Sequence, residues 1–292
     1  MNRIKGILYA AVSSSTFGLA PFFSITLLLA GFSAFEVLSY RWGVASIVLI
    51  VFGWLSGCNF RLAGKDWGVV FLLSLLRAVT SFSLIIAYQN IASGVASTIH
   101  FMYPLAVSLA MMFFFHEKKS LLVMLAVLMS LFGAALLSSG ELEAKSGDTI
   151  VGLVAACISV FSYGGYIIGV RTTRAAQINS TVLTCYVMGM GAVLYLIGAM
   201  ATSGLHLVTD GYIWLIILGL ALPATAISNI TLVRAIKYAG PTLTSILGAM
   251  EPLTAVVIGV FVFKELFTLN SVIGILLILL AVGMVVFRKQ KS

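Results

Sequence analysis

Charged residues are scarce in this sequence. They make up 9% of its 292 residues, whereas 61% are hydrophobic and the mean hydropathy is +1.14. Soluble domains have about 25% charged and about 45–50% apolar residues, so this composition excludes an ordinary soluble domain. Runs such as Leu121–Leu137 and Tyr212–Leu222 lack the apolar/polar alternation of a membrane β-barrel. The sequence therefore predicts an all-α integral membrane protein.

Motifs of enzymes, metal sites and nucleic-acid binding are also missing. The net charge is +8, but the basic residues are scattered through short segments and form no stripe, which argues against nucleic acid. The three cysteines share no metal-like spacing and build no disulfide framework. No HExxH motif, paired aspartates or nucleotide-binding loop occurs. We therefore expect no enzyme, no cofactor, no metal and no ATP-driven step.

Hydrophobic runs between short polar breaks predict ten membrane spans. The first run follows a basic start and resembles a signal peptide, but it is long and lacks a clear cleavage site, so we expect an uncleaved first helix. Each run is long enough to cross a bilayer. The spans are residues 4–30, 34–56, 67–91, 94–115, 120–138, 149–170, 180–203, 211–235, 241–263 and 270–287.

The distribution of lysine and arginine predicts the orientation of these spans. With the N-terminus in the cytoplasm, 13 of the 17 basic residues fall in inside segments, two (Lys145 and Lys264) in outside loops and two within spans. This bias follows the positive-inside rule. We expect a multi-pass protein of the cell inner (cytoplasmic) membrane with both termini cytoplasmic.

The two halves of the chain resemble each other. An offset of 148 residues places Tyr103–Pro104 on Glu251–Pro252, and an offset of 146 places Gly43 on Gly189. We predict a first repeat over 1–140 and a second over 147–292, five spans each. Because five is odd, the repeats enter the membrane from opposite sides, which is typical of alternating-access transporters with a midplane binding site.

These repeated features resemble the drug/metabolite transporter superfamily, and within it the EamA branch. The residues that carry the resemblance are Pro104 to Glu117, Glu251–Pro252 to Glu265 followed by Gly274, and Arg41 in the second span. The resemblance implies ten helices, a 5+5 inverted repeat, a central cavity and export or exchange of small metabolites. Its better understood members include amino-acid exporters of the YddG and RhtA type.

Glu251 is the first candidate for transport chemistry. It lies about 15 Å into a predicted span, near the middle of a hydrocarbon core about 30 Å thick. A carboxylate at that depth faces a partner or a water-filled cavity. Glu251 is therefore a candidate proton-coupling residue. The alternative is a static acid that holds the ninth span in shape.

Two arginines also lie within spans. Arg77 is near mid-depth, where it could receive a substrate carboxylate or phosphate in bidentate geometry, or form a buried ion pair with Glu251 or Glu36. Arg41 is shallower and follows Glu36 by about one and a half turns. An intrahelical pair with Glu36, or an interfacial pair, is the expected role of Arg41.

Further candidates for the cavity wall are polar or aromatic residues of the other spans. His100 and Tyr103 are one turn apart, so they could line the cavity together. Ser14, Phe17, Trp42 and Tyr163 supply hydroxyls and an aromatic wall, although packing explains them as well. Pro104 and Pro252 are expected to kink their spans and act as hinges.

The sequence thus predicts a secondary transporter that exports or exchanges amino acids by alternating access. The alternative inside the same fold is an exporter of another solute, such as a drug-like cation, a nucleoside or a sugar derivative. A channel or an intramembrane enzyme fits the pattern less well. We expect a small-molecule substrate and the lipid bilayer as partners, no nucleic acid, and a monomer or weak dimer.

Overall fold

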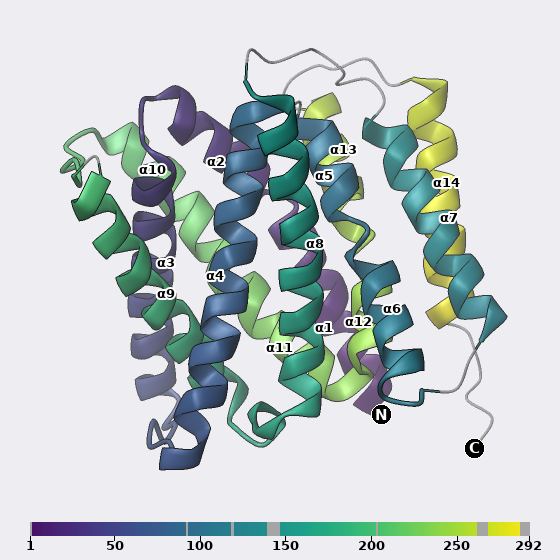
Figure 1. Cartoon of the computed structure of the whole chain (residues 1–292), viewed down its shortest axis with the longest axis horizontal. Coiled ribbons are helices and arrows are strands. Elements are labelled where there is room, and N and C mark those ends of the chain that lie inside the picture. The colour runs from purple at the N-terminus through teal and green to yellow at the C-terminus, as the bar shows by residue number, and fades with distance from the viewer. Residues whose placement is uncertain are drawn as a thin grey trace.

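The computed structural model describes residues 2–91, 93–117, 120–138, 147–202, 204–261 and 268–286. Within these ranges every regular element is a helix (Figure 1). This confirms the predicted all-α fold. Glu265, Lys145 and Lys264 lie outside the described residues.

In the first half of the chain, the first and fourth predicted spans are each broken into two helices, and the second, third and fifth are continuous. The elements of this half are α1 (Asn2–Phe17), α2 (Ala20–Leu29), α3 (Ala34–Leu55), η1 (Gly64–Asp66), α4 (Trp67–Asn90), α5 (Ser93–His100), α6 (Tyr103–Phe113) and α7 (Leu121–Ser138). Those of the second half are α8 (Thr149–Thr172), η2 (Arg174–Ala176), α9 (Ser180–Thr202), α10 (Gly211–Ala221), η3 (Leu222–Ile227), α11 (Ser228–Ala239), α12 (Pro241–Leu247), α13 (Met250–Phe261) and α14 (Leu269–Val286).

Seven segments of the described chain are long and apolar enough to cross a membrane. Two shorter apolar helices, Leu121–Leu136 and Val272–Met284, lie at the predicted fifth and tenth spans. The ninth span is broken into α12 and α13. A multi-pass membrane protein is therefore confirmed, whereas the count of ten and the orientation of the termini stay predictions.

Proline marks the breaks between helices. The sequence has five prolines, and each lies within the first three residues of a helix. A proline is tolerated there because the N–H groups of the first turn have no intrahelical partner. At Pro104 and Pro252 the predicted kinks are full breaks, between α5 and α6 and between α12 and α13.

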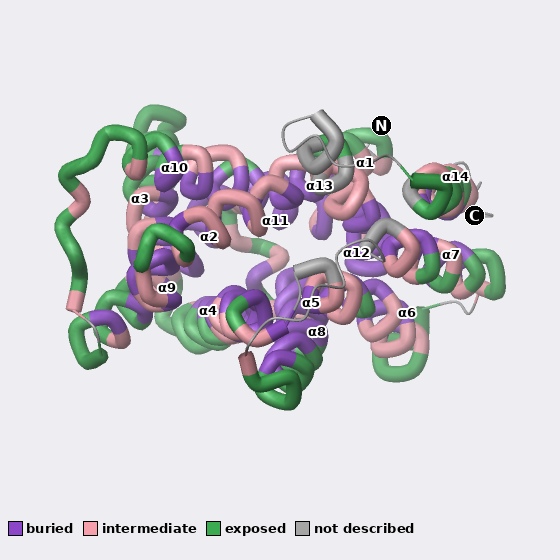
Figure 2. Tube along the Cα trace, turned by 90° about the horizontal axis from the view of Figure 1, so that it is seen from above, coloured by how far each residue is buried: buried purple, intermediate pink, exposed green. Residues whose placement is uncertain are grey.

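The helices pack in a pattern that is preserved when the two halves are exchanged. α3 packs on α9 and α7 on α14, which are equivalent spans of the two repeats. α4 packs on α8, and its counterpart is α11 on α1. Figures 1 and 2 show α7 and α14 together at one end of the bundle. Buried residues face the middle in Figure 2, while large exposed apolar side chains cover the outside.

The loops repeat this symmetry at the two ends of the α3–α9 pair. The Tyr40 hydroxyl on α3 donates to the carbonyl of His206, in the segment after α9. The Tyr186 hydroxyl on α9 donates to the carbonyl of Phe60, in the segment after α3, at 2.8 Å. An offset of 146 converts one bond into the other, so the inverted repeat extends to single hydrogen bonds.

Gly191 lies where α9 packs closely against α3, so a substitution there tests this contact. A Cβ atom at Gly191 would lie 2.1 Å from Cζ3 of Trp42, a side chain only 1% exposed, whereas a Cβ at Gly189 meets nothing within 4 Å. We expect Gly191→Ala to destabilise the fold by about 1–3 kcal/mol through overpacking. Gly189→Ala is the control, and better helix propensity should leave it neutral or stabilising. Apparent melting temperatures in detergent check both; equal melting temperatures would contradict this packing.

Candidate functional site

Most of the predicted site residues meet at the centre of the bundle. Phe17 ends α1, Arg77 lies in the middle of α4, Tyr163 lies on α8, and His100 and Tyr103 flank the break between α5 and α6. All five side chains are at least nine-tenths buried. The structure thus brings side chains of both repeats to one place.

Two guanidinium groups lie against aromatic rings at this centre. The Cζ atom of Arg77 is 5.3 Å from the ring centroid of Phe17, 5.1 Å from that of Tyr163 and 6.0 Å from that of Tyr166. The Cζ atom of Arg41 is 5.5 Å from the Phe17 centroid. Phe17 and Tyr163 also stack on each other, with centroids 6.4 Å apart. Aromatic faces stabilise cations at such distances, more so where water is excluded.

Neutral oxygen atoms accept the hydrogen bonds of Arg77. Its Nε donates to Oδ1 of Asn229 at 3.0 Å, and its Nη1 donates to Oγ of Ser81 at 3.2 Å. Asn229 is on α11 and Ser81 is one turn beyond Arg77 on α4. Arg77 is therefore held between the two repeats by groups without charge.

Arg41 is bound in the same way. Its Nε donates to Oγ1 of Thr225 at 2.6 Å, and its Nη2 lies 3.5 Å from the carbonyl oxygen of Ala224. Both acceptors belong to η3, the π-helical turn between α10 and α11. The expected structural pair of Arg41 with Glu36 is therefore wrong.

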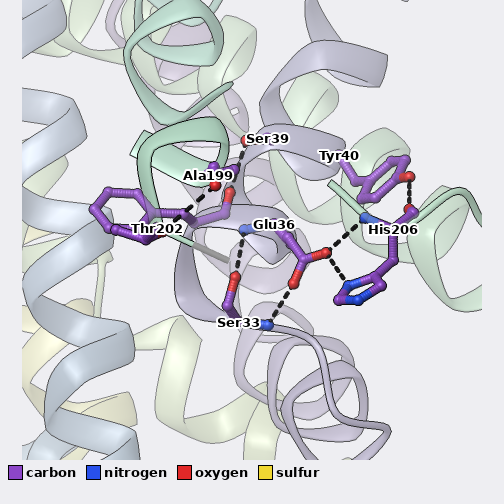
Figure 3. Close-up of polar contacts among 8 residues, drawn as sticks. Ser33, Glu36, Ser39, Tyr40, Ala199, Thr202 and His206 are labelled. Carbon is purple, nitrogen blue, oxygen red and sulfur yellow. Dashed lines mark hydrogen bonds and ion pairs between the residues drawn. The ribbon is translucent and has the colours of Figure 1, made fainter. Parts of the chain in front are cut away.

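Glu36 has a different partner, shown in Figure 3. Its Oε2 accepts from the backbone N–H of Ser33 in a capping box at the start of α3. Its Oε1 accepts from the backbone N–H of His206 at 2.9 Å and lies 2.6 Å from Nδ1 of the same residue. Its carboxylate is thus committed to the helix start and to the segment after α9, which leaves Arg41 to η3.

Among the described residues, no carboxylate oxygen lies within 4.0 Å of the guanidinium of Arg41 or Arg77. His206–Glu36 is the one ion pair within 4.0 Å in the part of the chain that the structure describes. The half-buried Glu251 lies within reach of a side-chain hydrogen bond with Tyr103 and is electrostatically coupled to Arg77. The alternative in which Glu251 or Glu36 pairs directly with Arg77 is thus not found.

A narrow cavity reaches both arginines. Its volume is about 20 Å³, room for about one water molecule. Phe17, Arg41 and Arg77 line it together with residues of α2 and the second half of α4. An amino acid does not fit into this volume, so the site must widen to bind one.

His100 lies behind the arginines in the aromatic cluster. Its ring stacks on Tyr163 at 5.3 Å, and its Nδ1 is 2.8 Å from Oγ of Ser159. The Ser159 hydroxyl lies 2.6 Å from the carbonyl of Ala156, to which it can donate its single proton. His100 Nδ1 is then the donor to Ser159. Its Nε2, an acceptor in that tautomer, is buried without a partner among the described residues.

Tyr103 and Glu251 are equivalent residues of the two repeats and lie at equivalent helix breaks. Their closeness depends on Gly248, because a Cβ at that position would lie 1.7 Å from the Tyr103 hydroxyl. The two proline breaks are thus in contact with each other at the centre of the bundle.

Two predicted cavity residues lie elsewhere. Trp42 packs edge-on against Tyr195, with centroids 5.2 Å apart and planes at 89°, in the contact of α3 with α9. Ser14 is buried on α1. Of the predicted cavity residues, Phe17 and Arg77 line the cavity, whereas Ser14, Trp42, His100, Tyr103, Tyr163 and Glu251 do not.

Thr225, Asn229 and Ser81 were missed as candidates. Small polar residues in a span are usually explained by helix packing. The repeat offset of 148 carried the missing signal, since it takes Arg77 to Thr225 and Ser81 to Asn229. No cluster of three or more His, Cys, Asp or Glu side chains suited to a metal occurs among the described residues.

Inverted repeats with broken helices that meet at a buried polar centre define a membrane transporter. The chain matches the EamA-like transporter family over residues 4–139 and again over 150–287, and it belongs to that family. A solved crystal structure has the same fold, with a TM-score of 0.80 at 18% identity, over 97% of this chain and 96% of that one. A search of curated proteins gives no match.

The bond between His100 and Ser159 can be tested by removing the hydroxyl. Ser159→Ala leaves Nδ1 of His100 unpaired in a buried place, which should cost about 1–3 kcal/mol and lower the apparent melting temperature in detergent. Ser130→Ala is the matched control, since Ser130 is equally buried and donates only to carbonyls of its own helix. An equal effect of both substitutions would argue against the bond.

Proposed function

We propose that the protein is a secondary active transporter that exports or exchanges amino acids by alternating access. Membership of the EamA-like family supports a membrane transporter. The proposed substrate class rests on two buried guanidiniums, those of Arg41 and Arg77, which line one cavity. Among the described residues, no carboxylate lies within 4.0 Å of either.

The charge of the site favours a solute with a carboxylate. Two guanidiniums and one half-buried carboxylate, Glu251, leave the centre short of negative charge. A substrate carboxylate can accept two parallel hydrogen bonds from a guanidinium, which is the strongest geometry available to it. The ammonium group of the same amino acid would be bound by aromatic faces and by Glu251. A solute with cationic charge alone would be repelled.

Access to the site is proposed to alternate at the paired helix breaks. The breaks at Pro104 and Pro252 meet at the centre. The cavity beside them, which residues of α1, α2, α3 and α4 line, holds about one water molecule. Rocking of one half against the other would widen it on one side at a time. We further propose the cell inner membrane as the location, both termini in the cytoplasm, and a monomer or weak dimer in the bilayer.

The substrate class is tested by counterflow in proteoliposomes. Vesicles loaded with single unlabelled amino acids should accumulate the labelled form, and we expect exchange of a few large neutral or aromatic ones. Empty vesicles are the control. No exchange with any amino acid, from protein shown to be folded, would point to a nucleoside, a sugar derivative or a drug-like solute.

The role of Arg77 is tested by substitution. Arg77→Ala should raise KM for a carboxylate-bearing substrate by roughly tenfold to a hundredfold, the worth of one or two charge-assisted hydrogen bonds. Arg234→Ala is the control, because Arg234 stacks on Tyr9 away from the site, at 5.5 Å. An unchanged KM for the carboxylate-bearing substrate in Arg77→Ala would show that Arg77 does not bind the carboxylate.

Glu251 is the proposed proton carrier. Glu251→Gln keeps the size and the hydrogen bonding of the side chain but cannot release a proton, so it should abolish any response of exchange to a pH gradient. Glu117→Gln is the matched control, because Glu117 accepts from Thr242 at 2.5 Å at the start of α12. A pH response retained in Glu251→Gln would assign proton coupling elsewhere.

A further inference from the structure

The π-helical turn η3 binds Arg41 through Thr225, and the first turn of α11, which follows it directly, binds Arg77 through Asn229. A π-turn is an α-helix with one extra residue, and such turns are frequent at functional sites. Pro223, its second residue, lacks a backbone N–H, and its ring disfavours a regular helix through this point. The equivalent residue of the first repeat is Leu75, and α4 continues there without a break. Pro223 thus accounts for the π-helical turn in the second repeat, where the first repeat has a regular α-helix.

The oxygen that Thr225 offers to Arg41 has a fixed orientation. The hydroxyl proton of Thr225 is donated to the carbonyl of Leu220 at 2.7 Å. A hydroxyl has one proton and two lone pairs, so the lone pairs remain for Nε of Arg41 at 2.6 Å. Thr225 is 0% exposed, so water does not compete for this bond.

Asn229 is oriented in the same manner. Its Nδ2 donates to the carbonyl of Thr225 at 2.7 Å, which leaves Oδ1 toward Nε of Arg77 at 3.0 Å. Asn229 is 1% exposed. Both acceptors are therefore held by main-chain carbonyls of the same span, and both present a neutral oxygen to a guanidinium.

We infer that Thr225 and Asn229 are positioning residues, which hold Arg41 and Arg77 in place for the carboxylate of the substrate without neutralising them. The inference rests on the proposed function. Neutral acceptors are required because a carboxylate at either position would pair with the arginine and exclude the substrate. Hydrogen bonds from the Nε atoms to neutral groups leave each arginine its charge, so its Nη groups stay available for a substrate carboxylate while Thr225 and Asn229 keep it in place.

Three substitutions separate this role from a purely structural one. Thr225→Val keeps the shape but loses the hydroxyl, and Thr225→Ser restores it. Asn229→Asp places a carboxylate beside Arg77. Thr231→Val is the matched control, because Thr231 lies on the same span and donates only to carbonyls of its own helix.

In counterflow of an amino acid that the wild type exchanges, Thr225→Val and Asn229→Asp should raise KM by about tenfold or more, the size of one lost hydrogen bond to a charged group. Vmax should change less than KM. Thr225→Ser and Thr231→Val should stay within about twofold of the wild type on both. The inference is overturned if Thr225→Val matches Thr231→Val, or if Thr225→Ser fails to restore KM. If Thr225→Val does not fold, the KM of Asn229→Asp tests the inference, and an unchanged KM there overturns it.

A second measurement needs no transport substrate. Benzoate carries a carboxylate on an aromatic ring, and benzylamine is a cation of similar size. We expect benzoate, but not benzylamine, to raise the apparent melting temperature of the wild type, Thr225→Ser and Thr231→Val, and not of Thr225→Val or Asn229→Asp. If the wild type exchanges no amino acid, the proposed function fails, and the benzoate series still decides the positioning role. No benzoate effect on the wild type would overturn it.

Discussion

A buried guanidinium must keep its charge and satisfy its donors away from water, and this constraint shapes the centre of the protein. Removing an ion from water costs several kcal/mol unless other groups replace the solvent. For Arg41 and Arg77 the replacement is made of aromatic faces and neutral oxygens. Phe17 contacts both arginines, η3 supplies the acceptor Thr225 to Arg41, and α11 supplies the acceptor Asn229 to Arg77. A carboxylate partner would stabilise each arginine more strongly, but it would also end its ability to bind an anion.

The inverted repeat explains why these groups converge. Equivalent residues of two inverted halves can touch only near the axis that relates the halves. Phe17 stacks on its equivalent Tyr163, and Tyr103 lies beside its equivalent Glu251. Arg77 donates to Ser81 on its own helix and to Asn229, the counterpart of Ser81 in the other repeat. The positions are related by the repeat while the chemistry is not, because Arg77 is a donor and its counterpart Thr225 is an acceptor.

Composition and the repeated motifs predicted the membrane class and the family, and the prolines predicted kinks at Pro104 and Pro252, which the structure shows as full breaks. The partner of Glu36 could not be predicted in this way. Its spacing from Arg41 favoured a pair on α3, but the capping box turns the carboxylate toward the helix start, where His206 arrives from 170 residues away. Thr225 and Asn229 resemble residues that pack helices together. What marks them in the sequence is the repeat, because they are the counterparts of Arg77 and Ser81.

A transporter must release what it binds, and this requirement fits the neutral partners of the arginines. A ligand shifts a conformational equilibrium only by the difference between its affinities for the two states. In the narrow state, Thr225 and Asn229 satisfy the Nε donors of Arg41 and Arg77, and the cavity has room for about one water. In the proposed widened state, a substrate carboxylate would bind the Nη groups while Thr225 and Asn229 keep the Nε donors. Because the contacts that hold the arginines are then the same with and without substrate, release of the substrate breaks none of them.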